Sequence, residues 1–201
     1  MSHRVPMLAF VACLAISGTA IAAPAVLENI PLKWSPTSTL AEMGPVDLSA
    51  PDLTVKIHID VLVDTRQNPT LIAQNTEKPD KPRSVTTSSD VGAFVTEHLK
   101  DSLHAGGLNT VDDAGDVTLS GEIRQLFVNE VNVYRGEASL VFHLKNSAGK
   151  EIWTGVVGGD AERFGRSYRA DNYYEVLSDT LLRAAHNLLA NPGFHAALEQ
   201  H

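Results

Sequence analysis

The sequence predicts an α+β domain, a two-layer sandwich in which two helices cover one face of a mostly antiparallel four-stranded sheet. Three observations support this class. One segment alternates between apolar and polar residues, two segments carry apolar residues at helical spacing, and further alternating segments lie between those two helices. In chain order the elements run βαβββα. Because each helix has a single apolar stripe, both are expected on the same face of the sheet.

The first strand is predicted over residues 53–64, which read LTVKIHIDVLVD. Its apolar residues share one parity, which is typical of a half-buried strand: Leu53, Val55, Ile57, Ile59, Val61 and Val63. A polar connection with three prolines follows over residues 64–88, with short extended pieces expected around Leu71-Ile72 and Val85. A connection of this length in a compact domain is either mobile or functional.

Caps and apolar stripes define the two helices. The first is predicted to begin at the Ser88-Ser89-Asp90 cap and to end at Ala105-Gly106-Gly107. Its stripe consists of Val91, Phe94, Val95, Leu99 and Leu103. The second helix is predicted to begin at Asn172, with Glu175 completing a capping box, and to end at Asn191-Pro192-Gly193. Its stripe consists of Val176 or Leu177, Leu181, Ala184 or Ala185, and Leu188.

Three strands are predicted between the helices, over residues 116–128, 135–146 and 150–160. Gly121 marks a bulge or a close-packing point in the first of them. The second and third are joined by a four-residue hairpin turn that ends at Gly149. In the third strand Ile152, Thr154 and Val156 share one face. Trp153 and Val157 lie on the opposite face, which is therefore not wholly polar.

Residues 1–22 have the features of a bacterial secretory signal: Arg4, an apolar run, and small residues that end at Ala22. The apolar run is about 12 residues long, whereas a bilayer span needs about 20. Cleavage after Ala22 would give an exported, periplasmic chain without cysteine, and so without disulfides or thiol chemistry. The alternative is acylation of Cys13, which follows Phe10-Val11-Ala12 and would anchor the chain to a membrane.

The rest of the chain is predicted to comprise a Pro-rich leader, residues 23–52, and a single domain, residues 53–201. Within the leader, Trp34 or Val46 and Leu48 would dock on the domain; a bare linker and an added edge strand are the alternatives. The net charge is −8, and loss of the signal would make it −9 because only Arg4 is removed. Nucleic acids and anionic lipid surfaces are therefore poor partners.

Local signatures of catalysis are missing from the sequence. It contains no G-x-S-x-G, H-E-x-x-H or G-x-x-x-x-G-K-[ST] motif, and its histidines are scattered without a metal-ligand spacing. We therefore expect no cofactor, no metal site, no catalytic residues and no enzymatic activity.

One loop, residues 159–172, is the local candidate for recognition. Arg163, Arg166, Tyr168 and Arg169 would contact an anion or a partner at the start of the last helix. The competing interpretation is structural: the arginines pair with neighbouring acids, and the tyrosines close the edge of the core.

Several segments resemble the YajG-type bacterial envelope proteins. Asp64-Thr65-Arg66 follows the first strand, then come Ile72-Ala73 and the helix-bearing segment of residues 85–111; the likeness extends over roughly residues 53–195. Ala73 stands where the family has glycine. The resemblance implies an outer-membrane lipoprotein that faces the periplasm and has no known enzymatic activity.

Three functions follow as hypotheses. The first is a non-enzymatic envelope accessory protein whose segments 64–88 and 160–171 contact envelope proteins. The second is a carrier or transport auxiliary that binds a small apolar or lipid ligand beside Trp34 or Trp153. The third is a hydrolase assembled from dispersed residues.

Overall fold

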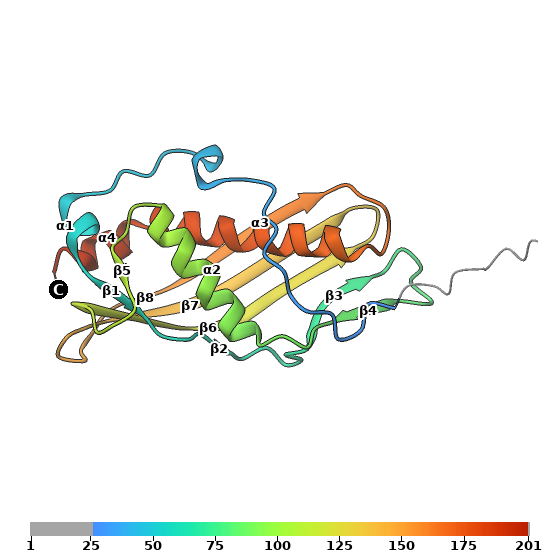
Figure 1. Ribbon diagram of the computed structural model, residues 1–201, viewed down its shortest axis with the longest axis horizontal. Coiled ribbons are helices and arrows are strands. Elements are labelled where there is room, and N and C mark those ends of the chain that lie inside the picture. The colour runs from blue at the N-terminus through green and yellow to red at the C-terminus, as the bar shows by residue number, and fades with distance from the viewer. Residues whose placement is uncertain (1–25, 201) are drawn as a thin grey trace, which may run out of the picture.

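The computed structural model describes residues 26–200, which form two layers, a mixed sheet of eight strands and a set of helices on one of its faces (Figure 1). The predicted signal segment, residues 1–22, and Cys13 within it lie outside the described residues. In chain order the elements are η1 (Leu40–Met43), α1 (Ala50–Thr54), β1 (Ile57–Ile59), β2 (Val63–Asp64), β3 (Leu71–Asn75), β4 (Arg83–Thr86), α2 (Val91–Ala105), β5 (Thr110–Val111), β6 (Val117–Glu130), β7 (Tyr134–Asn146), β8 (Glu151–Arg163), α3 (Ala170–Leu189) and α4 (Pro192–Leu198).

The sheet is organised around β6. β7 pairs antiparallel along the length of β6, and β8 pairs antiparallel with β7. On the other edge of β6 the short strands β1, β2 and β3 follow one another, all parallel to it. β5 lies beside β1, and β4 pairs antiparallel with β3. The α+β class is confirmed, but the expected four-stranded, mostly antiparallel sheet is wrong, because the sheet is larger and mixed.

The predicted first strand, residues 53–64, is interrupted. Leu53 belongs to α1, and the five residues from Ile59 to Val63 lie opposite only four residues of β6, Leu119 to Glu122. This extra residue reverses the alternation, so that Val61 and Val63 are 64% and 60% exposed while Leu62 is buried. The Leu62 amide donates to Thr96 Oγ1 of α2 at 2.9 Å, which fixes the break beneath that helix.

The polar connection over residues 64–88 contains a strand hairpin, β3 and β4, that extends the sheet. Ile72, Ala73 and Val85 are completely buried. Arg66 holds the segment to the sheet, because its guanidinium donates to both Asp64 oxygens and to the carbonyls of Pro69, Leu71 and Leu126. The connection is therefore part of the folded body.

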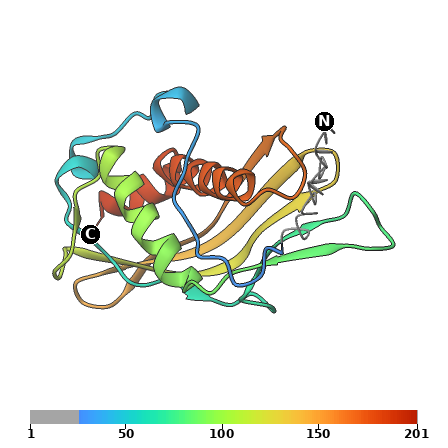
Figure 2. The same cartoon turned by 45° about the vertical axis from the view of Figure 1, so that its right-hand side comes forward.

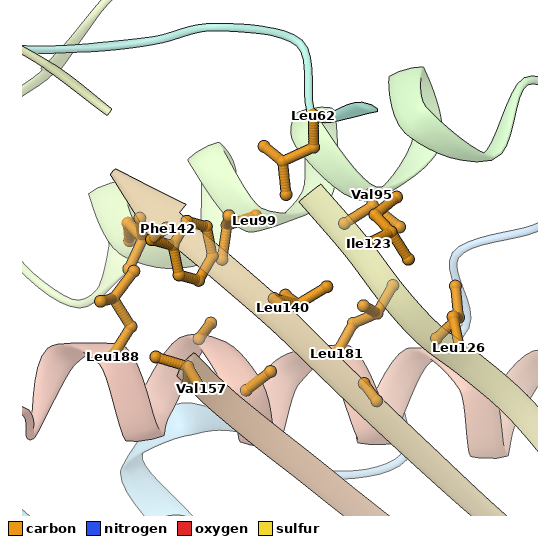
Figure 3. Packing of buried hydrophobic residues seen from close by; sticks show 14 of the residues in the cluster. Leu62, Val95, Leu99, Ile123, Leu126, Leu140, Phe142, Val157, Leu181 and Leu188 are labelled. Carbon is orange, nitrogen blue, oxygen red and sulfur yellow. The ribbon is translucent and has the colours of Figure 1, made fainter. Parts of the chain in front are cut away.

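Helix α2 has the predicted cap and the predicted stripe. Asp90 accepts from the Ala93 amide at 3.0 Å, and Gly107, at φ 106°, turns the chain after the last helical residue. The stripe packs against α3 and the sheet, as Figure 3 shows for Val95 and Leu99 beside residues of β6 and β7.

Helix α3 begins at Ala170, before Asn172, so the predicted capping box is wrong. The side-chain amide of Asn172 donates to the Arg166 carbonyl at 2.9 Å, and Glu175 forms an ion pair with Arg163 at 2.7 Å. The predicted stripe of α3 is buried. Helix α3 ends at Leu189, just before the predicted stop at Asn191-Pro192-Gly193. Asn191 caps α4 instead, by accepting from two first-turn amides.

Strand β8 turns Trp153 and Val157 toward the helices, while Val156 is 68% exposed on the open face. Trp153 packs edge to face on Phe194 of α4, with ring centroids 5.4 Å apart. A Cβ on Gly159 would lie 2.2 Å from the Thr180 carbonyl oxygen, so α3 rests directly on the backbone of β8.

Residues 26–49 cross the helical layer (Figure 2). Trp34 stacks on His98 of α2 with centroids 4.4 Å apart. The Ser35 amide donates to Ser178, and Asp179 accepts from the amides of Thr37 and Ser38, so this segment contacts both long helices. No helix within residues 26–200 is long and apolar enough to cross a membrane.

Candidate functional site

Glu130, the last residue of β6, is a buried carboxylate. A bulge at Arg124 places it there, because Ile123 and Gln125 pair with adjacent residues of β7 and the alternation reverses. The inward residues after the bulge are Leu126, Val128 and Glu130. Only 1% of Glu130 is exposed, so its oxygens need partners within the protein.

Two groups donate to the side-chain carboxylate of Glu130. The Tyr168 amide lies 3.0 Å and 3.2 Å from its two oxygens, and the Tyr173 hydroxyl donates to Oε2. Burial, and then the nearby Glu130 carboxylate, raise the pKa of Tyr173 far above its ordinary value of 10.0. The phenol therefore keeps its proton and remains a donor.

Tyr134, at the start of β7, fixes the loop before α3 from beneath. Its hydroxyl donates to the Arg166 carbonyl at 2.6 Å and accepts from the Arg169 amide at 3.2 Å. Its ring meets that of Tyr173 edge to face, with centroids 4.9 Å apart. Burial raises the pKa of Tyr134, which keeps this hydroxyl protonated.

Tyr168 connects the same loop to β4. Its backbone has φ 55°, which is uncommon for a bulky residue, and the bonds from its amide to Glu130 hold it there. Its hydroxyl donates to the Ser84 carbonyl at 3.0 Å. The Arg83 guanidinium lies 3.9 Å above its ring, a cation–π contact.

A hydrogen-bonded chain joins the β3–β4 hairpin to this loop. Buried Asn75 donates to Ser167 Oγ at 3.0 Å, and Ser167 donates to Glu77 at 2.6 Å. Segments 64–88 and 160–171, which the sequence suggests as separate contact regions, therefore meet at one end of the sheet.

Two hollows open at this end. A pocket of about 340 Å³ in the hairpin is lined by Asn75, Glu77, Lys78, Lys81 and Arg83. Another, of about 440 Å³, lies at the β6–β7 turn and is lined by Val131, Val133, Arg135, Phe164 and neighbouring polar residues. Phe164 is 78% exposed. We call residues 75–83, 131–133 and 164–169 the distal surface; the three segments lie at the same end in Figure 1.

The four residues predicted for recognition occupy different environments. Arg163 is half-buried and paired with Glu175, and Tyr168 is buried. Arg166 and Arg169 are exposed, and their backbone groups bond to Tyr134. Their contact with an anion or a partner stays a prediction, as does acylation of Cys13, which lies outside the described residues.

Sequence reasoning missed Glu130 and the hairpin cations. Glu130 had a signal, because it continues the parity of Leu126 and Val128 and an acid at an inward strand position needs partners. The sequence carries no signal for the cluster of Lys78, Lys81 and Arg83, because only the folded hairpin brings these residues around one pocket. Among residues 26–200, no group of three or more His, Asp or Glu is placed to hold a metal ion.

No protein-family model matches the sequence, and no curated protein matches it significantly. Its fold is similar to that of XCC0632 from Xanthomonas campestris, a protein of family DUF330, with a TM-score of 0.56, 8% identity, and coverage of 78% of this chain and 98% of that one.

Two weaker similarities are to the PelC dodecamer from Paraburkholderia phytofirmans and to a minor lipoprotein from Acinetobacter baumannii. The first has a TM-score of 0.43 and 15% identity over 74% of this chain and 95% of that one. The second has a TM-score of 0.34 and 16% identity over 68% and 93%. The TM-score of 0.56 shows that the chain shares the fold of the Xanthomonas DUF330 protein.

Proposed function

We propose that this chain is a non-enzymatic, exported accessory protein of the bacterial cell envelope, which binds another envelope protein through its distal surface. The observation that carries the proposal is the meeting of the β3–β4 hairpin and the loop before α3, held together by Asn75, Ser167 and Glu77. A surface made of interlocked segments is pre-organised, which lowers the entropic cost of binding.

The chemistry of this surface supports a protein partner. Phe164 and Val131 are 78% and 42% exposed beside one hollow, and Arg135 lines the same hollow. Exposed aromatic and arginine side chains are enriched where proteins bind proteins. The buried polar groups below are engaged with one another: Glu130 accepts from Tyr168 and Tyr173, which supports a structural role over a catalytic one.

The carrier hypothesis receives less support. Trp34 stacks on His98, and Trp153 packs on Phe194, so both tryptophans proposed to meet a ligand contact the protein's own rings.

Site-specific photo-crosslinking in intact cells tests the proposal. A photoreactive residue at Phe164 is compared with one at Val156, a control of similar exposure, 78% against 68%, on the open face of the sheet. We expect a discrete adduct with an envelope protein from position 164 and none from position 156. Equal labelling from both positions, or labelling from position 156 alone, would contradict the proposal.

A further inference from the structure

The β3–β4 hairpin gathers three cations around one small pocket. Lys78 and Lys81 come from its turn and Arg83 from the start of β4, and all three line the hollow of about 340 Å³. None of the three forms an ion pair with a carboxylate of residues 26–200. Their charges are therefore available to a ligand.

The acids nearby do not cancel this charge. Glu77 is the one acid in the lining, and its Oε2 accepts from Ser167, so the lining carries a formal charge of +2, three cations against one carboxylate. Asp80 lies in the turn outside the lining. In a chain of net charge −8, a positive hollow favours a small anion over an extended polyanion.

One side of the pocket is held by contacts with the loop before α3. The Arg83 guanidinium lies 3.9 Å above the Tyr168 ring, and Tyr168 is held by its amide bonds to Glu130. Asn75, 2% exposed, also lines the pocket and donates to Ser167. A planar guanidinium can donate two parallel N–H bonds to a phosphate or carboxylate.

We infer that this pocket binds a phosphate-type anion, either a free phosphate or the phosphate headgroup of an anionic lipid, with Arg83 as the oriented donor and the two lysines as further cations. Because the pocket forms part of the distal surface, this anion site would belong to the same binding surface. That the anion is met in the cell envelope rests on the proposed function. Anion binding itself is a property of this chain alone.

The test uses the full-length gene product as the cell processes it, titrated with inorganic phosphate while amide NMR signals of residues 75–83 are followed. We expect saturable shifts with a Kd of about 1 mM or lower. Lys78→Gln with Lys81→Gln should weaken binding at least about tenfold, since each removed bond involves charged groups. Lys145→Gln with Lys150→Gln, at the β7–β8 hairpin, removes the same charge and should leave the affinity unchanged.

Vesicles of phosphatidylcholine with and without phosphatidylglycerol identify the source of the anion. Binding only to the anionic vesicles, competed by phosphate and lost in the Lys78/Lys81 variant, would identify a lipid headgroup. Phosphate binding without vesicle binding would identify a soluble ligand. Absence of saturable binding in both arms, or equal affinity of the two lysine variants, would overturn the inference. Because no partner is present in these measurements, their failure is distinguishable from failure of the crosslinking test.

Discussion

A single bulge residue decides what lies beneath the distal surface. Arg124 shifts the alternation of β6 by one position and so turns Glu130 inward, where Tyr168 and Tyr173 donate to it. Without that shift Glu130 would point to the open face, and the loop before α3 would lose its anchor. The position of the Arg83 guanidinium over the Tyr168 ring depends on the same contacts, because Glu130 holds Tyr168 in place.

Tyr173→Phe tests this anchor. The substitution leaves the buried Glu130 carboxylate with the Tyr168 amide and without its phenolic donor, so the free energy of unfolding should fall by about 1.5–3 kcal/mol in urea titrations. Tyr174→Phe is the matched control, because Tyr174 is also buried in α3 and its hydroxyl donates to no carboxylate among the described residues. Equal losses in the two variants would contradict the role assigned to Glu130.

Asp52 should make the stability depend on pH. It is 1% exposed and bonds to His195 Nδ1 at 2.8 Å, which links α1 to α4. Burial opposes ionisation, but the hydrogen bonds from His195 and Ser49 outweigh it and hold the pKa of Asp52 below its ordinary value of 3.8. A depressed carboxyl pKa contributes stability in full above the unfolded-state value, and this contribution is lost as the pH falls through the folded-state value.

Asp52→Asn should therefore be less stable than the wild-type protein at about pH 6, and the difference should shrink below about pH 4. Urea unfolding at the two pH values measures this change. Asp113→Asn, at an exposed acid, serves as the control and should show a small difference at both. A difference that stays constant with pH for Asp52→Asn would show that the charge of the carboxylate is not involved.

Among the elements, those set by local pattern were predictable. The cap at Asp90 and the stripe of α2 depend on residues three and four apart, and β6, β7 and β8 were located from alternation. The bulges after Ile59 and at Arg124 were not, because each is fixed by pairing with a distant strand. The strands of the β3–β4 hairpin lie where short extended pieces were expected, around Leu71-Ile72 and Val85, but their pairing with each other and with β6 was not predicted, because polar residues surround the inward positions Ile72, Ala73 and Val85.

The candidate site likewise combines features that a local pattern reveals with features that depend on distant residues. Tyr168 and the arginines were noticed as a local cluster, yet their role depends on Tyr134 and Glu130, which are distant in sequence. The parallel pairing of β1 with β6 was within reach, since a strand, a helix and a second strand in succession typically form a parallel pair.

The contact of α3 with β8 makes an element-scale prediction. A methyl group on Gly159 would meet the backbone of Thr180 and Ala184, whereas one on Gly158 would meet only the Ala138 carbonyl at 3.5 Å, an ordinary contact. Gly159→Ala should therefore lower the free energy of unfolding by about 1–3 kcal/mol, because a helix backbone must move. Gly158→Ala should change it by less than about 0.5 kcal/mol. Similar values for the two alanine variants in urea titrations would place α3 farther from the sheet.

At the scale of the whole molecule, the segment before β1 is packed on both long helices. Its apolar side chains join the core cluster, among them Leu27, Ile30, Leu32, Trp34, Val46 and Leu48. It starts beside β4, where Ile30 forms a bridge with Thr87, and ends at α1 beside α4. A segment that its composition predicts to be a leader therefore contacts both ends of the molecule.

Trp34→Ala tests whether this segment contributes to global stability. Trp34 is half-buried against His98 and Phe94, so its loss should lower the free energy of unfolding by about 1–3 kcal/mol, less than for a fully buried tryptophan. Burial also lowers the pKa of His98 below its ordinary 6.5, so an NMR titration of the variant should show that pKa rising. Leu53→Ala, at a residue 51% exposed in the same N-terminal part, should leave both quantities nearly unchanged. If Trp34→Ala also left the free energy of unfolding and the pKa of His98 unchanged, residues 26–49 would lie away from the helices in solution, and the domain would begin at β1.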